Sequence, residues 1–163
     1  TSRRQRQMCI RDRSHASEKS FWDVIKLSKA PIICSHSSSM AMCKHDRNLT
    51  DEQLKALAQN GGVAQVCLLD RYINEDYKNA SLTDAIEHID HMVKVAGIDH
   101  VGIGSDFDGG GGIIGCESDN DFIQITVKLI EKGYTEEDIA KIWGGNLMRV
   151  LDEVQATASV KTL

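Results

Sequence analysis

Several features that mark common functional classes are missing from this chain of 163 residues. No apolar run reaches the ~20 residues of a membrane-spanning helix, and neither end carries a secretory or anchor-type hydrophobic segment. The formal net charge of −5 excludes the basic surface typical of nucleic-acid-binding proteins. No apolar run leads into a GxGxxG motif or a P-loop, which weakens a nucleotide-binding function. We therefore expect neither a membrane nor a nucleic acid as a partner.

Paired CxxC spacing is also missing. The chain has 5 cysteines, an odd number, and they are scattered along the sequence. A disulfide framework needs an even set at regular spacing, and disulfides are rare in reducing compartments. The pattern predicts free thiols and a cytoplasmic location. The positions are Cys9, Cys34, Cys43, Cys67 and Cys116.

The first thirteen residues differ in composition from the rest. They contain five arginines, and Asp12 is their single acid. Without them, Lys and Arg fall from 19 to 14 and Asp and Glu from 24 to 23, so the remainder carries −9. We predict a foreign or disordered head at 1–13, one folded domain at 14–156 and a short tail at 157–163.

Short apolar segments alternate with helical patterns along the folded part. The segments at 31–36, 63–69 and 100–106 have the continuous apolar character of strands that are covered on both faces. Strands that alternate with helices indicate a parallel α/β sheet, either a (β/α) barrel or an open sheet. The predicted helices begin at capping residues, which are Ser17, Thr50, Ser81 and Thr135.

Polar residues follow the apolar segments at the edge where parallel α/β folds bind ligands. His15 and His36 are 21 residues apart, the length of one strand–helix unit. Imidazoles at neighbouring strand ends suit zinc, although two unrelated loop histidines would give the same spacing. Asp106 follows a later strand and favours the metal interpretation. Two histidines and a carboxylate are the composition of a hydrolytic metal site.

Four other side chains have weaker signals. His88 and His91 lie off the apolar stripe of the helix that begins at Ser81, so we expect exposed or half-exposed structural histidines there. Arg47 lies in the loop after the His36 strand, on the predicted ligand side. It could bind a carboxylate or form a surface ion pair. The same alternatives apply to Tyr72.

Two long stretches, "SHASEKSFWDVIKLSKAPIICSHSSSMAMCKHDRNLTDEQ" and "HIDHMVKVAGIDHVGIGSDFDG", closely resemble the membrane (renal) dipeptidase family of zinc metallopeptidases. The similarity runs from about Ser14 to about Val154. It implies the C-terminal half of a (β/α)8 TIM barrel, from the fifth to the eighth strand. It also implies two zinc ions at the barrel mouth and hydrolysis of dipeptides, often with a D-residue at the C-terminal position.

The resemblance also implies roles for individual residues. His15 and His36 match the two histidine ligands of the second zinc. Arg47 matches the arginine that holds the free carboxylate of the substrate, and Tyr72 matches a tyrosine that assists it. Asp106 matches the aspartate that works with the bridging hydroxide and passes a proton to the leaving amine.

Part of the family pattern is not found. The His-x-Asp pair of the first strand, the bridging Glu of the third strand and a further histidine have no counterpart, so these residues supply at most a partial zinc site. Cys67 stands where relatives often have Asn. We expect the chain alone to be inactive. Two alternatives stay open: a metal-dependent amidohydrolase with another substrate, and a non-catalytic half-barrel that packs with a partner or forms a homodimer.

Overall fold

The centre of the molecule is a three-stranded parallel sheet, as the alternating pattern predicts. The computed structural model describes residues 12–159. Strands β1 (Ile33–Cys34), β2 (Val63–Cys67) and β3 (Val101–Ser105) lie in that order, and both pairs are parallel. Asp12 adds a single parallel bridge to Ile33 at the β1 edge. Most of the predicted head, residues 1–11, lies outside the described residues.

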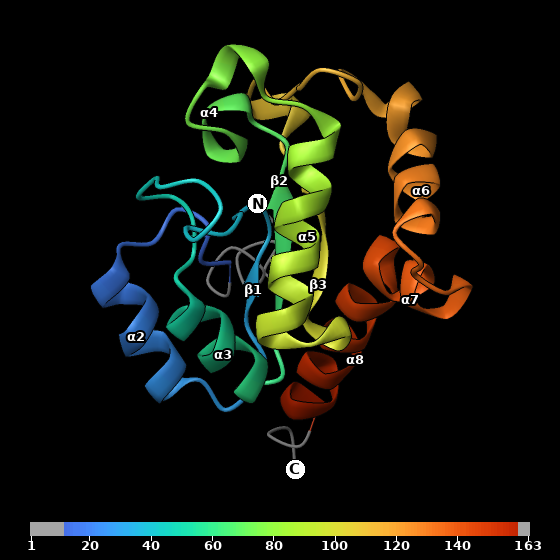
Figure 1. Ribbon diagram of the computed structural model, residues 1–163. Helices are drawn as coiled ribbons and strands as arrows, with labels where there is room; N and C mark the ends of the chain where they lie inside the picture. The colour runs from blue at the N-terminus through green and yellow to red at the C-terminus, as the bar shows by residue number, and fades with distance from the viewer. Residues whose placement is uncertain (1–11, 160–163) are drawn as a thin grey trace.

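Helices surround the sheet on several sides (Figure 1). α5 lies in front of the strands, α2 and α3 lie beyond the β1 edge, and α6 lies beyond β3 (Figure 1). The segment Lys141–Gly145 joins α7 to α8 and is kinked at Gly144, whose backbone is not helical. The helices are α2 (Glu18–Leu27), α3 (Asp51–Gln59), α4 (Asp70–Ile73), α5 (Leu82–Ala96), α6 (Phe122–Glu131), α7 (Glu136–Ala140) and α8 (Asn146–Ser159). Within residues 12–159, none of them is both long and apolar enough to cross a membrane.

The predicted capping residues do begin helices. Ser17, Thr50, Ser81 and Thr135 each accept a hydrogen bond from a backbone N–H of the first turn. The last three form reciprocal capping boxes, in which the side chain three residues on accepts from the backbone of the cap. These local signals are readable from sequence because each bond joins residues only three positions apart.

The core lies between the sheet and its helices. Every residue of β2 is buried, which is the pattern of a central parallel strand. Its two valines, Val63 and Val66, each contribute roughly 1.5–3 kcal/mol by leaving water. The largest apolar side chains packed around the sheet are Phe21, Ile32, Leu54, Leu57, Leu68, Ile86, Ile89, Met92, Ile125, Leu129 and Ile142.

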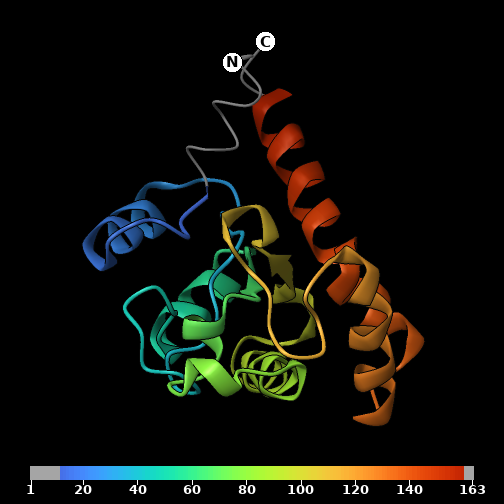
Figure 2. The same ribbon diagram turned by 90° about the horizontal axis from the view of Figure 1, so that it is seen from above.

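α8 contacts the segments that precede the strands. The Nη1 and Nη2 groups of Arg149 donate to the carbonyls of Gly61 and Asp99, both at 2.9 Å. Gly61 precedes β2 and Asp99 precedes β3, so Arg149 ties α8 to the amino-terminal ends of the sheet, and α8 itself lies behind the strands (Figure 2). The carboxyl ends lie at the opposite edge, on the side of α4 (Figure 1).

The two histidines of α5 have structural partners. His91 is half-buried, and its Nε2 lies 2.7 Å from Oδ1 of Asp51 on α3, as expected for a structural residue. The prediction of exposure was wrong for His88, which is only 1% exposed. Its Nδ1 accepts from the Ser39 N–H and its Nε2 lies 2.9 Å from the Ile73 carbonyl. These partners come from a loop and from the end of α4, and the periodicity of α5 does not detect them.

The capping box of α3 provides a stability test. Replacing Thr50 with Ala removes the acceptor of the Gln53 N–H, 3.2 Å away, and we expect a loss of about 1 kcal/mol in the free energy of unfolding. Thr157→Ala is the matched control. The Thr157 hydroxyl bonds to the Glu153 carbonyl inside α8, where Ala has the higher helix propensity. Urea unfolding of both variants measures the difference, and equal stabilities would contradict the capping role.

Candidate active site

The polar residues singled out from sequence lie around the carboxyl edge of the sheet. His36 comes two residues after β1, and Asp106 directly follows β3. His15 follows the Asp12 bridge, on the outer side of β1. Arg47 lies in the loop between β1 and α3, and Tyr72 lies in α4 after β2. The parallel direction of the strands therefore collects residues that are up to 91 positions apart in the chain.

His15 and His36 face each other. Their Nε2 atoms are 2.8 Å apart, and their ring centroids are 4.8 Å apart at an interplanar angle of 63°. Two imidazoles on one tetrahedral zinc ion, each at about 2.1 Å, hold their nitrogens about 3.4 Å apart. A separation of roughly 0.6 Å more than the observed one would admit the ion between them. The pair therefore fits two ligands of one zinc ion.

A hydrogen-bond chain sets the tautomer of His36. Its Nδ1 lies 2.7 Å from the Ser35 hydroxyl, and that hydroxyl donates to Oδ2 of Asp12. Since the hydroxyl proton is used on Asp12, Nδ1 carries the proton of the imidazole. The Nε2 lone pair then points toward His15. A carboxylate that orients a histidine from behind is the usual support of a metal ligand in proteins.

Asp12 is ionised in this chain of contacts. Burial raises the pKa of its carboxyl, but hydrogen bonds from Ser35 and from the Ser14 N–H outweigh burial and hold the pKa below its ordinary value. Asp12 therefore remains an acceptor at neutral pH. From sequence alone Asp12 falls in the predicted foreign head, because the arginines around it dominate the local composition.

The pKa of His15 is lowered from its ordinary value. Desolvation is the largest cause, followed by electrostatic interactions with Arg47 and His36, while Asp106 and Asp12 act in the opposite direction. His15 is thus neutral at pH 7, the form that binds a metal. The same balance shows that His15 is close enough to Arg47 and Asp106 to feel both charges.

Asp106 occupies a strained backbone position. Ser105 has φ 44° and Asp106 has φ 72°, a left-handed conformation that non-glycine residues seldom adopt. The Asp106 carbonyl accepts from the N–H groups of Gly109 at 3.0 Å and Gly111 at 2.8 Å, which holds the turn in place. A Cβ at Gly109 would collide with Oδ1 of Asp106, so a side chain there would force the carboxylate to move. Strain of this kind clusters at functional sites.

Cys67 lies against the same carboxylate. Its thiol donates to Oδ2 of Asp106 at an Sγ–Oδ2 distance of 3.6 Å, and its side chain is fully buried. Burial, the largest cause, and the Asp106 charge together raise the pKa of the Cys67 thiol to about 12, against the effect of the Leu69 N–H. The thiol stays protonated and remains a donor at neutral pH.

Arg47 and Tyr72 are in contact. The Arg47 Cζ lies 5.6 Å from the centroid of the Tyr72 ring, and Nε of Arg47 donates to the Ser14 carbonyl at 3.0 Å. Nη2 of Arg47 is buried and has no hydrogen-bond partner within the described chain. The guanidinium therefore has a fixed position and one unsatisfied donor, as expected of a group that binds an anion.

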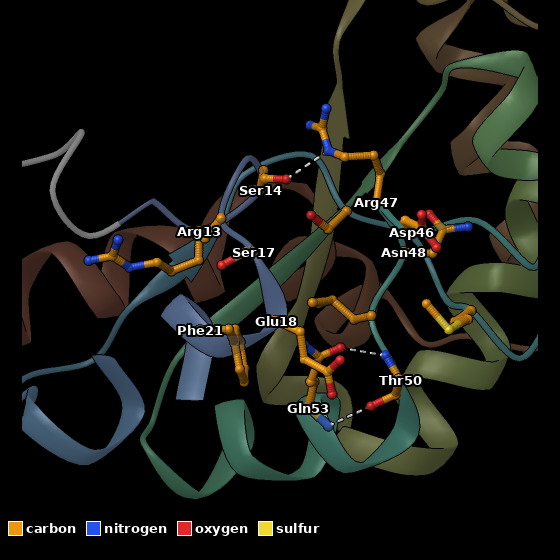
Figure 3. Close-up of a pocket in the computed structure, with 14 residues that line it drawn as sticks. Arg13, Ser14, Ser17, Glu18, Phe21, Asp46, Arg47, Asn48, Thr50 and Gln53 are labelled. Carbon is orange, nitrogen blue, oxygen red and sulfur yellow. Dashed lines mark hydrogen bonds between the residues drawn. The ribbon is translucent and has the colours of Figure 1, made fainter. Parts of the chain in front are cut away.

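A cavity of about 330 Å³ lies on the other side of Arg47 (Figure 3). Its walls come from the start of α2 and from the loop between β1 and α3, including Ser14, Phe21, Arg47 and Gln53. His15, His36 and Asp106 do not line it. In Figure 3 the Arg47 guanidinium points away from Glu18 and Thr50, so this cavity lies behind the residue rather than around its charged end.

The described residues, 12–159, contain no cluster of three or more His, Cys, Asp or Glu side chains that could hold a metal ion. His15 and His36 form only a pair. Sequence reasoning also missed Ser35 and His45, which contact His36 and Tyr72. Both lie in loops, where no periodic pattern marks a functional side chain.

The chain is similar to known dipeptidases over most of its length. The model of the membrane dipeptidase family, peptidase family M19, matches residues 4–163, which begins ahead of the boundary predicted at residue 14. Dipeptidase ataJ of Aspergillus terreus is 42% identical over 151 residues, which are 91% of this chain and 37% of that protein.

Solved structures of dipeptidases have a fold similar to that of this chain. The probable dipeptidase PvdM of Pseudomonas aeruginosa superposes with a TM-score of 0.84 at 31% identity, over 89% of this chain and 50% of that one. A metallopeptidase of Rhodobacter sphaeroides, solved with a phosphinate mimic of the dipeptide L-Ala-D-Ala, gives 0.82 at 32% identity, over 87% and 41%. The chain thus spans between about a third and a half of the length of these relatives. With a family model that covers nearly all of its residues and a matching fold, the chain belongs to the membrane dipeptidase family M19.

Proposed function

We propose that this chain supplies the second half of a zinc dipeptidase barrel, from its fifth to its eighth strand, and takes part in hydrolysis of the peptide bond of dipeptides. The observation that carries the proposal is the pair of imidazoles, with Nε2 atoms 2.8 Å apart, next to an arginine and an aspartate. The phosphinate dipeptide mimic bound by the Rhodobacter sphaeroides relative supports a dipeptide as substrate.

In this proposal His15 and His36 hold one zinc ion. Two histidines are fewer than the three or four protein ligands of an ordinary zinc site, so further ligands come from residues other than those described. Zinc in such a site supplies Lewis acidity toward the carbonyl oxygen of the scissile bond. The Asp12–Ser35–His36 chain keeps the His36 imidazole oriented and its Nε2 lone pair available.

The remaining residues bind the substrate and move a proton. Arg47 offers Nη2 to the C-terminal carboxylate of the dipeptide, and the Tyr72 ring supports the guanidinium. Asp106 accepts a proton from the attacking water, whose oxygen bonds to the carbonyl carbon, and delivers it to the nitrogen of the leaving amino acid as the C–N bond breaks. A dipeptide differs from a longer peptide because a free amine and a free carboxylate flank its single peptide bond.

One observation favours a second candidate function, a non-catalytic half-barrel that pairs with another chain. α6 exposes three apolar side chains at helical spacing, Ile123, Val127 and Ile130, with exposed fractions of 62%, 40% and 59%. An exposed stripe of this kind suits packing against a second protein surface. The experiments below separate the two functions, because only the dipeptidase requires the imidazole pair.

Removing one imidazole tests the metal site. In the full-length protein, His36→Ala should lower zinc content by about one ion per chain, because the remaining imidazole cannot hold the ion alone. His91→Ala is the matched control, since His91 pairs with Asp51 on the outer helices. Zinc is measured by atomic absorption after dialysis, and unchanged zinc in the His36 variant would rule out this site.

Removing the guanidinium tests substrate binding. Arg47→Ala should raise the KM for a dipeptide by about 10- to 100-fold, because the carboxylate loses a charge-assisted hydrogen bond. Zinc content should stay the same. Arg71→Ala removes a largely exposed arginine paired with Asp70 and should leave KM unchanged. A normal KM together with lost zinc in the Arg47 variant would make Arg47 a structural residue.

Replacing the carboxylate tests proton transfer. Asp106→Asn keeps the size of the side chain but cannot accept or deliver the proton, so kcat should fall by about 100-fold or more. Asp108→Asn changes an exposed carboxylate two residues away and should have little effect on kcat. Steady-state kinetics with saturating dipeptide measure both variants. Equal kcat values would remove Asp106 from the catalytic step.

A further inference from the structure

His45 contacts both residues that are proposed to bind the substrate carboxylate. It lies in the loop between β1 and α3, two residues before Arg47, and is half-buried. Its Nδ1 accepts a hydrogen bond from the Arg47 backbone N–H at 3.1 Å. Its ring centroid lies 4.4 Å from that of Tyr72, at an interplanar angle of 51°. One side chain therefore joins the arginine of the loop to the tyrosine of α4.

The bond to Arg47 shapes the backbone of the loop. The His45 carbonyl accepts from the Asn48 N–H at 2.9 Å, which closes a turn with Arg47 as its third residue. The imidazole satisfies the N–H of Arg47 inside that turn, in the way that an Asn or Asp side chain accepts an N–H two residues on. Because Nδ1 is the acceptor, the proton of the neutral ring is on Nε2.

A second anchor ties the same loop to α4. Nδ2 of Asn48 donates to the carbonyls of Cys43 at 2.9 Å and Tyr72 at 2.8 Å, and Asn48 is 2% exposed. Asn48 thus fixes the main chain of the loop against α4. His45 acts on the side chains instead. It contacts the Tyr72 ring, and that ring is also the surface over which the Arg47 guanidinium lies.

We propose that His45 is a positioning residue for recognition of the substrate's C-terminal carboxylate. It sets the backbone conformation at Arg47 and the orientation of the Tyr72 ring together, so that the guanidinium meets the carboxylate in one geometry. This inference rests on the proposed function of Arg47. It extends that function to a residue that touches neither the substrate nor the metal site, and whose effect is confined to substrates with a free carboxylate.

The test compares two substrates in the full-length protein, a dipeptide and the same dipeptide with its C-terminus amidated. His45→Ala should raise the KM of the free dipeptide about three- to tenfold, the cost of one hydrogen bond and a ring contact, with kcat within about twofold. The KM of the amide should stay the same, because its C-terminus carries no charge for Arg47 to bind.

Two conservative variants separate the two contacts of His45. His45→Asn keeps an acceptor for the Arg47 N–H but loses the ring, and His45→Phe keeps a ring against Tyr72 but loses the acceptor. Each should restore part of the KM difference between the two substrates. Zinc content and the unfolding midpoint of all three variants should match those of the unaltered protein.

Arg47→Ala, measured with both substrates, distinguishes the possible failures. If this variant still prefers the free dipeptide over the amide, Arg47 does not bind the carboxylate, and the proposed function and the inference both fail. If Arg47→Ala removes the preference while His45→Ala leaves it intact, only the role of His45 is overturned. A His45→Ala variant that loses activity equally on both substrates would also overturn it, because a general structural defect would not depend on the carboxylate.

Discussion

The parallel pairing of β2 with both neighbours is the constraint on which the site depends. All five residues of β2 are buried, and its ladders to β1 and β3 are parallel. Because parallel strands end at the same edge, the segments after β1, β2 and β3 must emerge together. Arg149 closes the opposite edge by binding the carbonyls of Gly61 and Asp99. The carboxyl edge is therefore left open for the polar side chains of the candidate site.

Hydrogen bonds across loops turn this common edge into a defined geometry. Asp12, Ser35 and His36 form one chain, and Ser14 adds three further contacts. Its N–H donates to Asp12, its hydroxyl accepts from the His36 N–H, and its carbonyl accepts from Arg47. Each polar group in this region is costly to bury alone and inexpensive when paired. The same hydrogen bonds lower the pKa of Asp12 against the effect of its burial, whereas the pKa of His15 is lowered chiefly by desolvation.

The backbone at Asp106 is strained, and this strain costs folding stability while it fixes the position of the side chain. Two consecutive non-glycine residues with positive φ cost of order 1–3 kcal/mol each, and hydrogen bonds from Gly109 and Gly111 hold them there. A shift in register between Val66 and Cys67 occurs at the same level of the sheet. It brings the Cys67 thiol against the Asp106 carboxylate. Gly109 leaves room for the Asp106 carboxylate, because a side chain at this position would occupy the same space.

Local signals in the sequence determined the elements of this protein. Capping residues, apolar runs and helical stripes each depend on neighbours within a few positions, so Thr50, Ser81 and the three strands were readable without coordinates. The spacing of His15 and His36, together with the family motifs, also predicted the residues of the candidate site. Tertiary structure alone decided the partners. The facing Nε2 atoms, the Asp12–Ser35–His36 chain, the burial of His88 and the contact of His45 with Tyr72 each join segments that are distant in sequence or lie in irregular loops. No periodicity encodes such contacts, because they arise only when the strands pair and bring their ends together.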